Sequence, residues 1–427
     1  MRLRYQVNDR LPWRQNLLYG LQWLAIAVPM ISIVGQVGGR IHYPADTQLQ
    51  LAYIGKVFLV TGVTWLLQLL WGHKLPVIAG PATVLLLGVL ANAAGGQDKA
   101  GAVYSAIAAG GLALAAVSAT PLIRRLTSLF TPLVTGVVLL LIAFTLLPTV
   151  VNLISGGTDF SFERGLFSGG LLGLMLLAQR LLPRLLRSTL IIWALLAGSL
   201  AHYSLFNAPL PSMAAARLSS SIWTPAISLE LDWGVLLSFL FCYLAVAAND
   251  AGSVQATAAL TGTEDSRRIK RGLLVTGIGN LLAGVCGVIG PVNYSLSSGA
   301  IAASGCASRY SMLPAAAVML LIACSPAVIQ AFLLIPPAVT GTLLLYMLCS
   351  QIAGGLGLLT PYLQTFQQEA GMIVGVSLLL GTGIAFLPAA AAEAVPALWR
   401  PLLTNGFVVG VTAAVVLEKA WKRPPEK

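Results

Sequence analysis

One carboxylate stands out in this sequence because of where it lies. Asp250 follows Asn249 in the middle of a run of apolar and small residues. A charged side chain at the centre of a membrane-spanning segment costs roughly 3 kcal/mol or more, so Asp250 must face a polar cavity or carry a proton. We expect Asp250 and Asn249 to bind a substrate and Asp250 to carry a coupling proton. The alternative is a structural acid that hydrogen-bonds the broken backbone of a neighbouring segment.

A second group of polar side chains precedes a glycine near the start of another apolar run. Ser295, Ser297 and Ser298 lie just before Gly299, where a short helix is expected to begin. Its free N–H groups and the positive end of its dipole would point into a cavity. A neutral or anionic ligand with carbonyl oxygens would suit such a helix end. Tyr294, next to these serines, could stack on a planar ring or simply pack.

The segments that must position these residues are broken at matched places in the two halves of the chain. Gly80-Pro81 follows a short apolar run, and Gly290-Pro291 does the same 210 residues later. The segment Pro132 to Gly136 opens a long apolar run, and Pro337 to Gly341 repeats it 205 residues later. This order and spacing favour duplication, and paired Gly/Pro-broken segments indicate a midplane binding site in a transporter.

The composition predicts an integral membrane protein of many spans. The chain is 57% hydrophobic and only 9% charged, against about 25% charged residues in soluble domains. Its apolar runs repeatedly exceed the roughly 20 residues that cross a bilayer, and such runs must be helical in lipid. The first run begins near Leu17 and is expected to remain as a span rather than to be cleaved. The sequence contains no P-loop, no metal-ligand cluster and no nucleophile–base pair, so we expect no enzyme activity, no cofactor and no metal.

Apolar length and flanking charge predict an all-α polytopic protein of fourteen transmembrane segments in two inverted seven-span repeats. Seven spans per half is an odd number, so the second half must enter the membrane upside down. The third and tenth segments are each interrupted by Gly-Pro and are expected to be part strand, part half-helix. Their non-helical stretches are expected to face each other across one cavity. The predicted segments are residues 15–36, 50–71, 76–92, 100–119, 129–150, 166–182, 188–206, 233–257, 272–289, 291–305, 312–330, 333–354, 370–388 and 402–418.

The distribution of lysine and arginine supports this count. With both termini in the cytoplasm, nineteen of the twenty-five basic residues fall in cytoplasmic loops, as the positive-inside rule requires. Five fall outside the membrane, namely Arg40, Lys99, Arg164, Arg217 and Arg400, and the remaining one, Lys56, lies near a span end. The formal net charge of +11 is therefore a topology signal, and no nucleic-acid partner is expected. We predict a multi-pass protein of the cell inner (plasma) membrane, with the lipid bilayer as its environment.

Several short pieces of the sequence occur in a recognisable order over nearly the whole chain. They are Gly20-Leu21-Gln22, Leu75-Pro76 followed by Gly80-Pro81, Pro132 to Gly136, Arg271-Gly272-Leu273-Leu274 and Gly290-Pro291. Together they resemble the nucleobase/ascorbate transporters, the family of uracil and xanthine permeases. The resemblance implies a core domain of residues 15–119 and 233–330, and a gate domain of residues 129–206 and 333–418. It also implies a substrate between the third and tenth segments, alternating access by movement of the core against the gate, and a homodimer through the gate.

The family's substrate motif aligns with the tenth segment in an altered form. In the family, an acidic or amide residue is followed by Asn-x-Gly and, five residues after that glycine, by Thr. In this chain the motif falls on Leu296-Ser297-Ser298-Gly299 and Ser304. Leu296 replaces the acidic or amide residue, Ser297 replaces the Asn and Ser304 replaces the Thr.

Three other segments would complete the substrate site. The family pattern Glu-x-x-x-Asp falls on residues 246–250, which keep the aspartate and have Val246 in place of the glutamate. Gln22 occupies the first position of the family's Gln-His pair and would either face the cavity or bridge helices. Met30 would line the cavity as apolar bulk. Thr83, at the end of the small residues after Ile78, would face it from the third segment.

Three classes of function remain open from the sequence. The first is a secondary transporter that takes up a purine or pyrimidine nucleobase, driven by protons through Asp250. The second is a transporter of an inorganic or small organic anion on the same fold, like the sulfate permeases or some aromatic-acid carriers. The third is a membrane enzyme or receptor, for which the sequence provides no feature.

Overall fold

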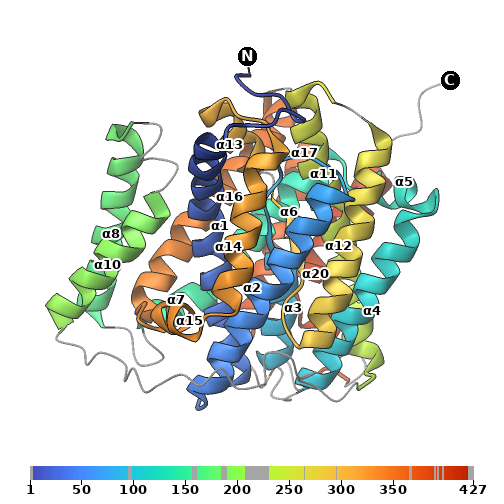
Figure 1. The fold of residues 1–427 in the computed structure, drawn as a ribbon. Helices are drawn as coiled ribbons and strands as arrows, with labels where there is room; N and C mark the ends of the chain where they lie inside the picture. Colours follow the sequence, from blue (N-terminus) through green and yellow to red (C-terminus); the bar gives the residue numbers. More distant parts are fainter. Residues whose placement is uncertain are drawn as a thin grey trace.

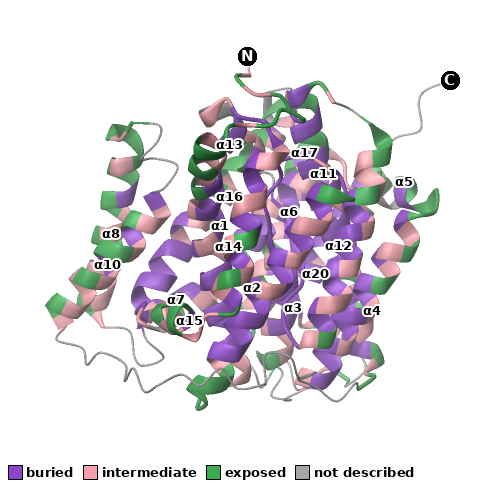
Figure 2. Ribbon diagram, in the orientation of Figure 1, coloured by how far each residue is buried: buried purple, intermediate pink, exposed green. Residues whose placement is uncertain are grey.

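The computed structural model describes residues 3–94, 99–155, 161–183, 190–206, 230–263, 265–294, 296–364, 368–388, 391, 394–396 and 399–421. Within these ranges the protein is a bundle of helices, most of which run in one common direction or its reverse (Figure 1). Buried residues fill the middle of the bundle, whereas many side chains of α8 and α10 are exposed (Figure 2). This pattern is expected of a protein whose outer surface faces lipid.

In the first half, the elements are α1 (Trp13–His42), α2 (Thr47–Leu70), β1 (Ala79–Pro81), α3 (Thr83–Ala94), α4 (Ala100–Ser118), α5 (Leu122–Thr127), α6 (Pro132–Thr145), α7 (Leu147–Ser155), α8 (Phe162–Leu181) and α10 (Leu190–Phe206). In the second half they are α11 (Trp233–Thr261), α12 (Ser266–Cys286), β2 (Pro291–Asn293), α13 (Leu296–Ser304), the 3₁₀ helix η2 (Arg309–Met312), α14 (Leu313–Ala323), α15 (Pro326–Leu333), α16 (Pro337–Gln364), α17 (Gln368–Ala385), α19 (Arg400–Leu403) and α20 (Gly406–Trp421).

The prediction of a polytopic helical membrane protein is confirmed. Among the described residues, eight helices are long and apolar enough to cross a membrane, or nine if one bent pair counts as a span. The bent pair corrects the predicted segment 312–330, because η2–α14 and α15 meet at 91° and do not form a straight span. The chain turns where Pro326 begins α15, since proline cannot continue the preceding helix but is tolerated in a first turn.

The two Gly-Pro breaks are non-helical, as predicted, and they form one small antiparallel sheet. Pro81 lies opposite Pro291, and Gly80 lies opposite Val292. The Ala82 N–H donates to the Gly290 carbonyl, and the Tyr294 N–H donates to the Ile78 carbonyl, each at 2.8 Å. We expected the two stretches to face each other across a cavity, and this was wrong because they pair directly. Pairing satisfies backbone groups that would be costly to leave free within a membrane.

Glycines allow α4 and α12 to approach each other at backbone distance. A Cβ atom on Gly284 would lie 2.4 Å from the Ala108 nitrogen, and one on Gly277 would lie 2.5 Å from the Ala115 nitrogen. Small residues at such crossings are typical of helices that pack in membranes. This contact fixes α12 against α4 and thereby positions the face of α12 that meets β2.

The helices that open with the repeated Pro motif, α6 and α16, pack in opposite directions. Gly136, near the start of α6, lies against Leu359 in the second half of α16. Gly341, near the start of α16, lies against Leu153 of α7, which continues from α6. Pro132 and Pro337 therefore lie at opposite ends of this helix pair.

Candidate functional site

Asp250 lies in the middle of α11 and is fully buried. Its Oδ1 accepts hydrogen bonds from the backbone N–H of Asn293 at 2.9 Å and from the Thr276 hydroxyl at 3.0 Å. The carboxylate therefore links α11 to strand β2 and to helix α12. Its second oxygen, Oδ2, has no hydrogen-bond partner among the described residues. Asp250 thus supports the broken backbone through one oxygen, and its role in binding or in proton coupling stays a prediction.

Two further polar side chains lie in the same buried region. Asn293 is fully buried, and both atoms of its amide lack a hydrogen-bond partner within the described part of the chain. Its side chain lies close enough to the Asp250 carboxyl and the His73 imidazole to interact with both. Buried polar atoms are normally paired, and these are exceptions. Asp250 Oδ2 and the Asn293 amide therefore mark a small polar centre beside β2.

His73, in the loop between α2 and β1, closes this polar centre. Although His73 lies near the end of a predicted segment, it is fully buried. Its Nδ1 accepts a hydrogen bond from the Leu75 N–H at 3.0 Å. Burial lowers the pKa of His73 to about 3, so its imidazole is neutral near pH 7. No sequence pattern predicts this placement, since His73 approaches Asn293 only because β1 pairs with β2.

Asn249 and Ser253 of α11 contact the last residue of β2, Asn293. The Ser253 hydroxyl donates to the Asn293 carbonyl at 2.9 Å and contacts the Asn249 carbonyl at 2.7 Å. The Asn249 amide nitrogen lies 3.5 Å from the same Asn293 carbonyl oxygen. These contacts give one turn of α11 a structural role in binding strand β2. Ser253 was absent from the predicted site because a serine within an apolar helix has no distinctive sequence signal.

Two predicted residues of the tenth segment stabilise the strands. The Tyr294 hydroxyl donates to the Pro81 carbonyl at 2.8 Å, and its ring covers Gly80, where a Cβ atom would lie 2.5 Å from the hydroxyl oxygen. The Ser297 hydroxyl accepts from the Ile78 N–H at 2.9 Å and donates to the Tyr294 carbonyl at 2.7 Å. Of the two roles considered for Tyr294, these contacts favour packing over stacking on a ligand. Ser295 lies outside the described residues.

The other predicted residues of the tenth segment form the open side of α13. Leu296 is 37% exposed, Ser298 is half-buried, and Gly299 is exposed with free space where a side chain would extend. Because Ser297 faces β1, these neighbours face other directions on the helix. Their contact with a substrate stays a prediction.

The predicted residues from the first half come from α1 and α3, which pack against each other, and α1 also packs against β1. Gln22, Met30 and Thr83 are each half-buried. Thr83 is the first residue of α3, directly after β1. The pairing of β1 with β2 therefore brings the start of α3 near the start of α13. Among the described residues, no hydrogen bond joins Gln22 or Met30 to Asp250, and their role in binding stays a prediction.

Comparisons with known proteins agree with this architecture. The sequence profile of the family described as "Permease family" matches residues 14–390. The chain is 27% identical to the xanthine permease XanP of Escherichia coli (strain K12), over 100% of this chain and 95% of that protein. It is 26% identical to the uric acid permease PucJ of Bacillus subtilis (strain 168), over 92% of this chain and 88% of that protein.

A solved structure extends the similarity to the fold. The structure of the murine anion transporter Solute Carrier 26 family member A9 in the inward-facing state matches with a TM-score of 0.62 and 14% identity, over 99% of this chain and 70% of that chain. At this identity the likeness concerns the fold alone. The family match covers most of the chain, so this multi-pass membrane protein is a transporter rather than an enzyme and belongs to the permease family of the nucleobase/ascorbate transporters, which its motifs resemble.

Proposed function

We propose that this protein is a secondary active transporter that takes up a purine or pyrimidine nucleobase by alternating access. The observation that carries the proposal is the pairing of the two non-helical stretches. The β1–β2 pair brings the starts of α3 and α13 together beside Asp250. The full-length similarity to permeases for xanthine and uric acid supports a nucleobase as the solute.

In this proposal, a core (residues 15–119 and 233–330) moves against a gate (residues 129–206 and 333–418). The chain would form fourteen segments in two inverted repeats. Two features support an inverted repeat. Pro81 and Pro291, which correspond in the two halves, lie opposite each other in an antiparallel sheet. The helices α6 and α16, which correspond in the same way, pack in opposite directions.

The proposed binding position is between the first turns of α3 and α13, with Thr83, Ser298 and Gly299 at the helix ends. Free N–H groups at these ends would donate to the carbonyl oxygens of an oxopurine or oxopyrimidine. Val246 and Leu296 replace the polar residues that the family carries, so binding would depend more on backbone donors. Gln22 and Met30 of α1 would border the same space.

The proposed coupling ion is a proton on Asp250. Its Oδ2 is buried and lacks a partner among the described residues, beside the unpaired amide of Asn293. A carboxylate in this setting is a candidate proton carrier in a membrane segment. We further propose a location in the plasma membrane with cytoplasmic termini, and a homodimer formed through the gate.

Competition separates the nucleobase proposal from anion transport. Uptake of radiolabelled xanthine by cells that express the protein would be measured with excess xanthine, urate, uracil, sulfate, bicarbonate or benzoate. Nucleobases should inhibit, and the three anions without a purine or pyrimidine ring should not. Inhibition by sulfate or bicarbonate, with no effect of any nucleobase, would overturn the proposal in favour of an anion carrier.

A further inference from the structure

A cavity of about 470 Å³ lies away from the β1–β2 pair, between α1 and α3 on one side and α7 and α16 on the other. Val37, Ile41 and Leu90 provide apolar walls from α1 and α3. Pro337, at the start of α16, borders the opposite side. The volume falls within the range of about 300–1,000 Å³ that is typical of small-molecule sites.

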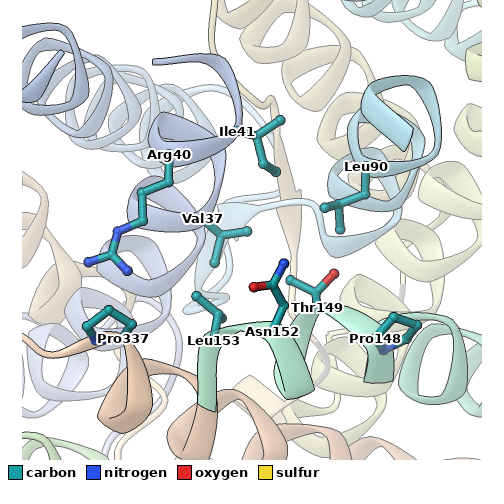
Figure 3. A pocket seen from close by; sticks show the side chains of 9 residues that line it. All are labelled: Val37, Arg40, Ile41, Leu90, Pro148, Thr149, Asn152, Leu153 and Pro337. Atoms are coloured by element: carbon teal, nitrogen blue, oxygen red, sulfur yellow. The ribbon is translucent and has the colours of Figure 1, made fainter. Parts of the chain in front are cut away.

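Three polar side chains line this cavity: Arg40 of α1, and Thr149 and Asn152 of α7 (Figure 3). Arg40 extends from α1 toward Pro337 at the edge of the cavity, and the Asn152 amide rises from α7 toward α1. Apolar walls with a few placed polar groups are the usual composition of a ligand site.

Arg40 gives the cavity a positive charge that no acid neutralises within the described part of the chain. The ion pair among the described residues joins Lys99 to Asp232, and neither residue lines the cavity. Arg40 is half-buried in the last turn of α1, and partial burial strengthens its attraction for an anion because water screens the charge less. The planar guanidinium also presents paired N–H donors that match two oxygens of one ligand.

The position of the cavity places it on the path to the proposed substrate site. The charge pattern of the sequence assigns Arg40 to the outer side of the membrane. Leu90 lies seven residues along α3 from Thr83, which corresponds to about 10 Å of helix. The cavity also lies between α1 and α3 of the proposed core and α7 and α16 of the proposed gate, where a solute would enter.

We propose that this cavity is an entrance subsite that captures a planar solute bearing a carbonyl or oxyanion edge before the solute reaches the β1–β2 crossing. Arg40 binds the electronegative edge, Asn152 and Thr149 hydrogen-bond the adjacent ring atoms, and Val37, Ile41 and Leu90 contact the ring faces. The solute class is an oxopurine, and its anionic form binds more tightly than a neutral one. This identity of the solute rests on the proposed function, whereas the anion preference rests on Arg40.

The test compares uptake of urate, an anion near neutral pH, with uptake of neutral hypoxanthine. Arg40→Gln should raise the KM for urate about tenfold, the effect of losing a charged hydrogen bond, and should change the KM for hypoxanthine much less. The salt dependence of urate uptake should weaken in the same variant, and Arg40→Lys should retain part of it. Arg400→Gln is the matched control, because it removes another outer positive charge away from the cavity and should keep the wild-type KM for both solutes.

A second measurement reads occupancy of the cavity without transport. Phenylglyoxal modifies accessible arginines, and mass spectrometry of the purified wild-type protein follows the peptide that contains Arg40. Urate should slow modification of Arg40 but not that of Arg400. If the wild type takes up neither purine while urate still protects Arg40, the transport proposal fails and the subsite stands. If uptake occurs, Arg40→Gln keeps the wild-type KM for urate, and urate leaves Arg40 labelling unchanged, the subsite proposal is overturned.

Discussion

At the scale of single residues, Asp250 combines a structural contact with an available oxygen. Oδ1 accepts hydrogen bonds from Asn293 and Thr276, and Oδ2 lies unpaired among the described residues. The two roles considered from the sequence, structural acid and proton carrier, are therefore compatible in one carboxyl group. An amide at position 250 separates the two roles, because it can still accept the structural hydrogen bonds but cannot titrate near neutral pH.

The first prediction concerns Asp250→Asn. The variant should stay folded, since the amide oxygen can still accept from the Asn293 N–H, and it should exchange substrate between pre-loaded vesicles. Uphill accumulation and the pH dependence of uptake should disappear. Accumulation against a gradient with an unchanged pH profile would show that Asp250 is structural and does not carry the proton.

The sequence was sufficient to find Asp250 and to place it in a helix, because a lone carboxylate in an apolar run is conspicuous. It could not reveal what Asp250 holds. Asn293 follows it by 43 positions, and their contact depends on β2 lying against α11. The same reason explains why the sequence does not predict the burial of His73: its environment is set by Asn293, a residue of β2.

At the scale of elements, glycines decide how closely helices approach. The Gly284→Ala substitution places a Cβ atom 2.4 Å from the Ala108 nitrogen and 2.5 Å from the Tyr104 carbonyl oxygen. Because both atoms belong to the backbone of α4, the helices must separate. We expect a loss of about 1–3 kcal/mol of stability, as for other overpacked cores.

A matched control is available on α11, where a Cβ atom on Gly252 would meet nothing within 4 Å. Gly252→Ala should leave stability unchanged or raise it slightly, since alanine favours helix over glycine by up to about 1 kcal/mol. Thermal unfolding of the two variants in detergent measures the difference. Equal melting temperatures for both variants would show that α4 and α12 are not packed this closely.

The start of α11 provides a prediction on pH. Asp232 caps this helix by accepting from Gly234 and Val235, and its carboxylate accepts from the Lys99 ammonium at 2.6 Å. Burial acts to raise the pKa of Asp232, but the bonds from Lys99 and the helix end outweigh it, so the pKa lies below the usual value. The contact therefore stabilises the fold above about pH 4 and is lost as the pH falls through the lowered pKa.

Asp232→Asn retains a capping side chain but removes the ion pair. Both side chains are partly exposed, at 24% for Asp232 and 29% for Lys99, so the loss should not exceed about 1 kcal/mol. The stability difference from the wild type should be constant between pH 7 and pH 5 and should shrink below pH 4. A difference that grows on acidification would contradict the assignment.

At this scale, sequence patterns predicted some features of the elements but not others. Proline and glycine signalled the strands at β1 and β2, because they break a helix in a predictable way. They did not signal that the strands pair directly, since that depends on contacts 210 or more positions apart. The turn at Pro326 was missed because the apolar run continues on both sides of it, and an apolar run alone does not fix a direction.

At the scale of the whole molecule, the opposite packing of α6 and α16 predicts that their starts lie on opposite sides of the membrane. Ser128, shortly before α6, and Ala331, shortly before α16, are both exposed. In a variant without the native cysteines, an impermeant maleimide should label Ala331→Cys in intact cells. It should label Ser128→Cys only after permeabilisation. Labelling of both positions in intact cells would exclude the inverted arrangement.

The most direct measurement is uptake of radiolabelled xanthine into proteoliposomes that contain only this protein, with an imposed proton gradient. The proposed function predicts accumulation above the external concentration, driven by an acidic exterior, abolished by a protonophore and reduced to exchange in Asp250→Asn. Liposomes that accumulate no nucleobase with the gradient in place, and show no exchange of pre-loaded xanthine, uric acid or uracil, would contradict nucleobase transport by this protein.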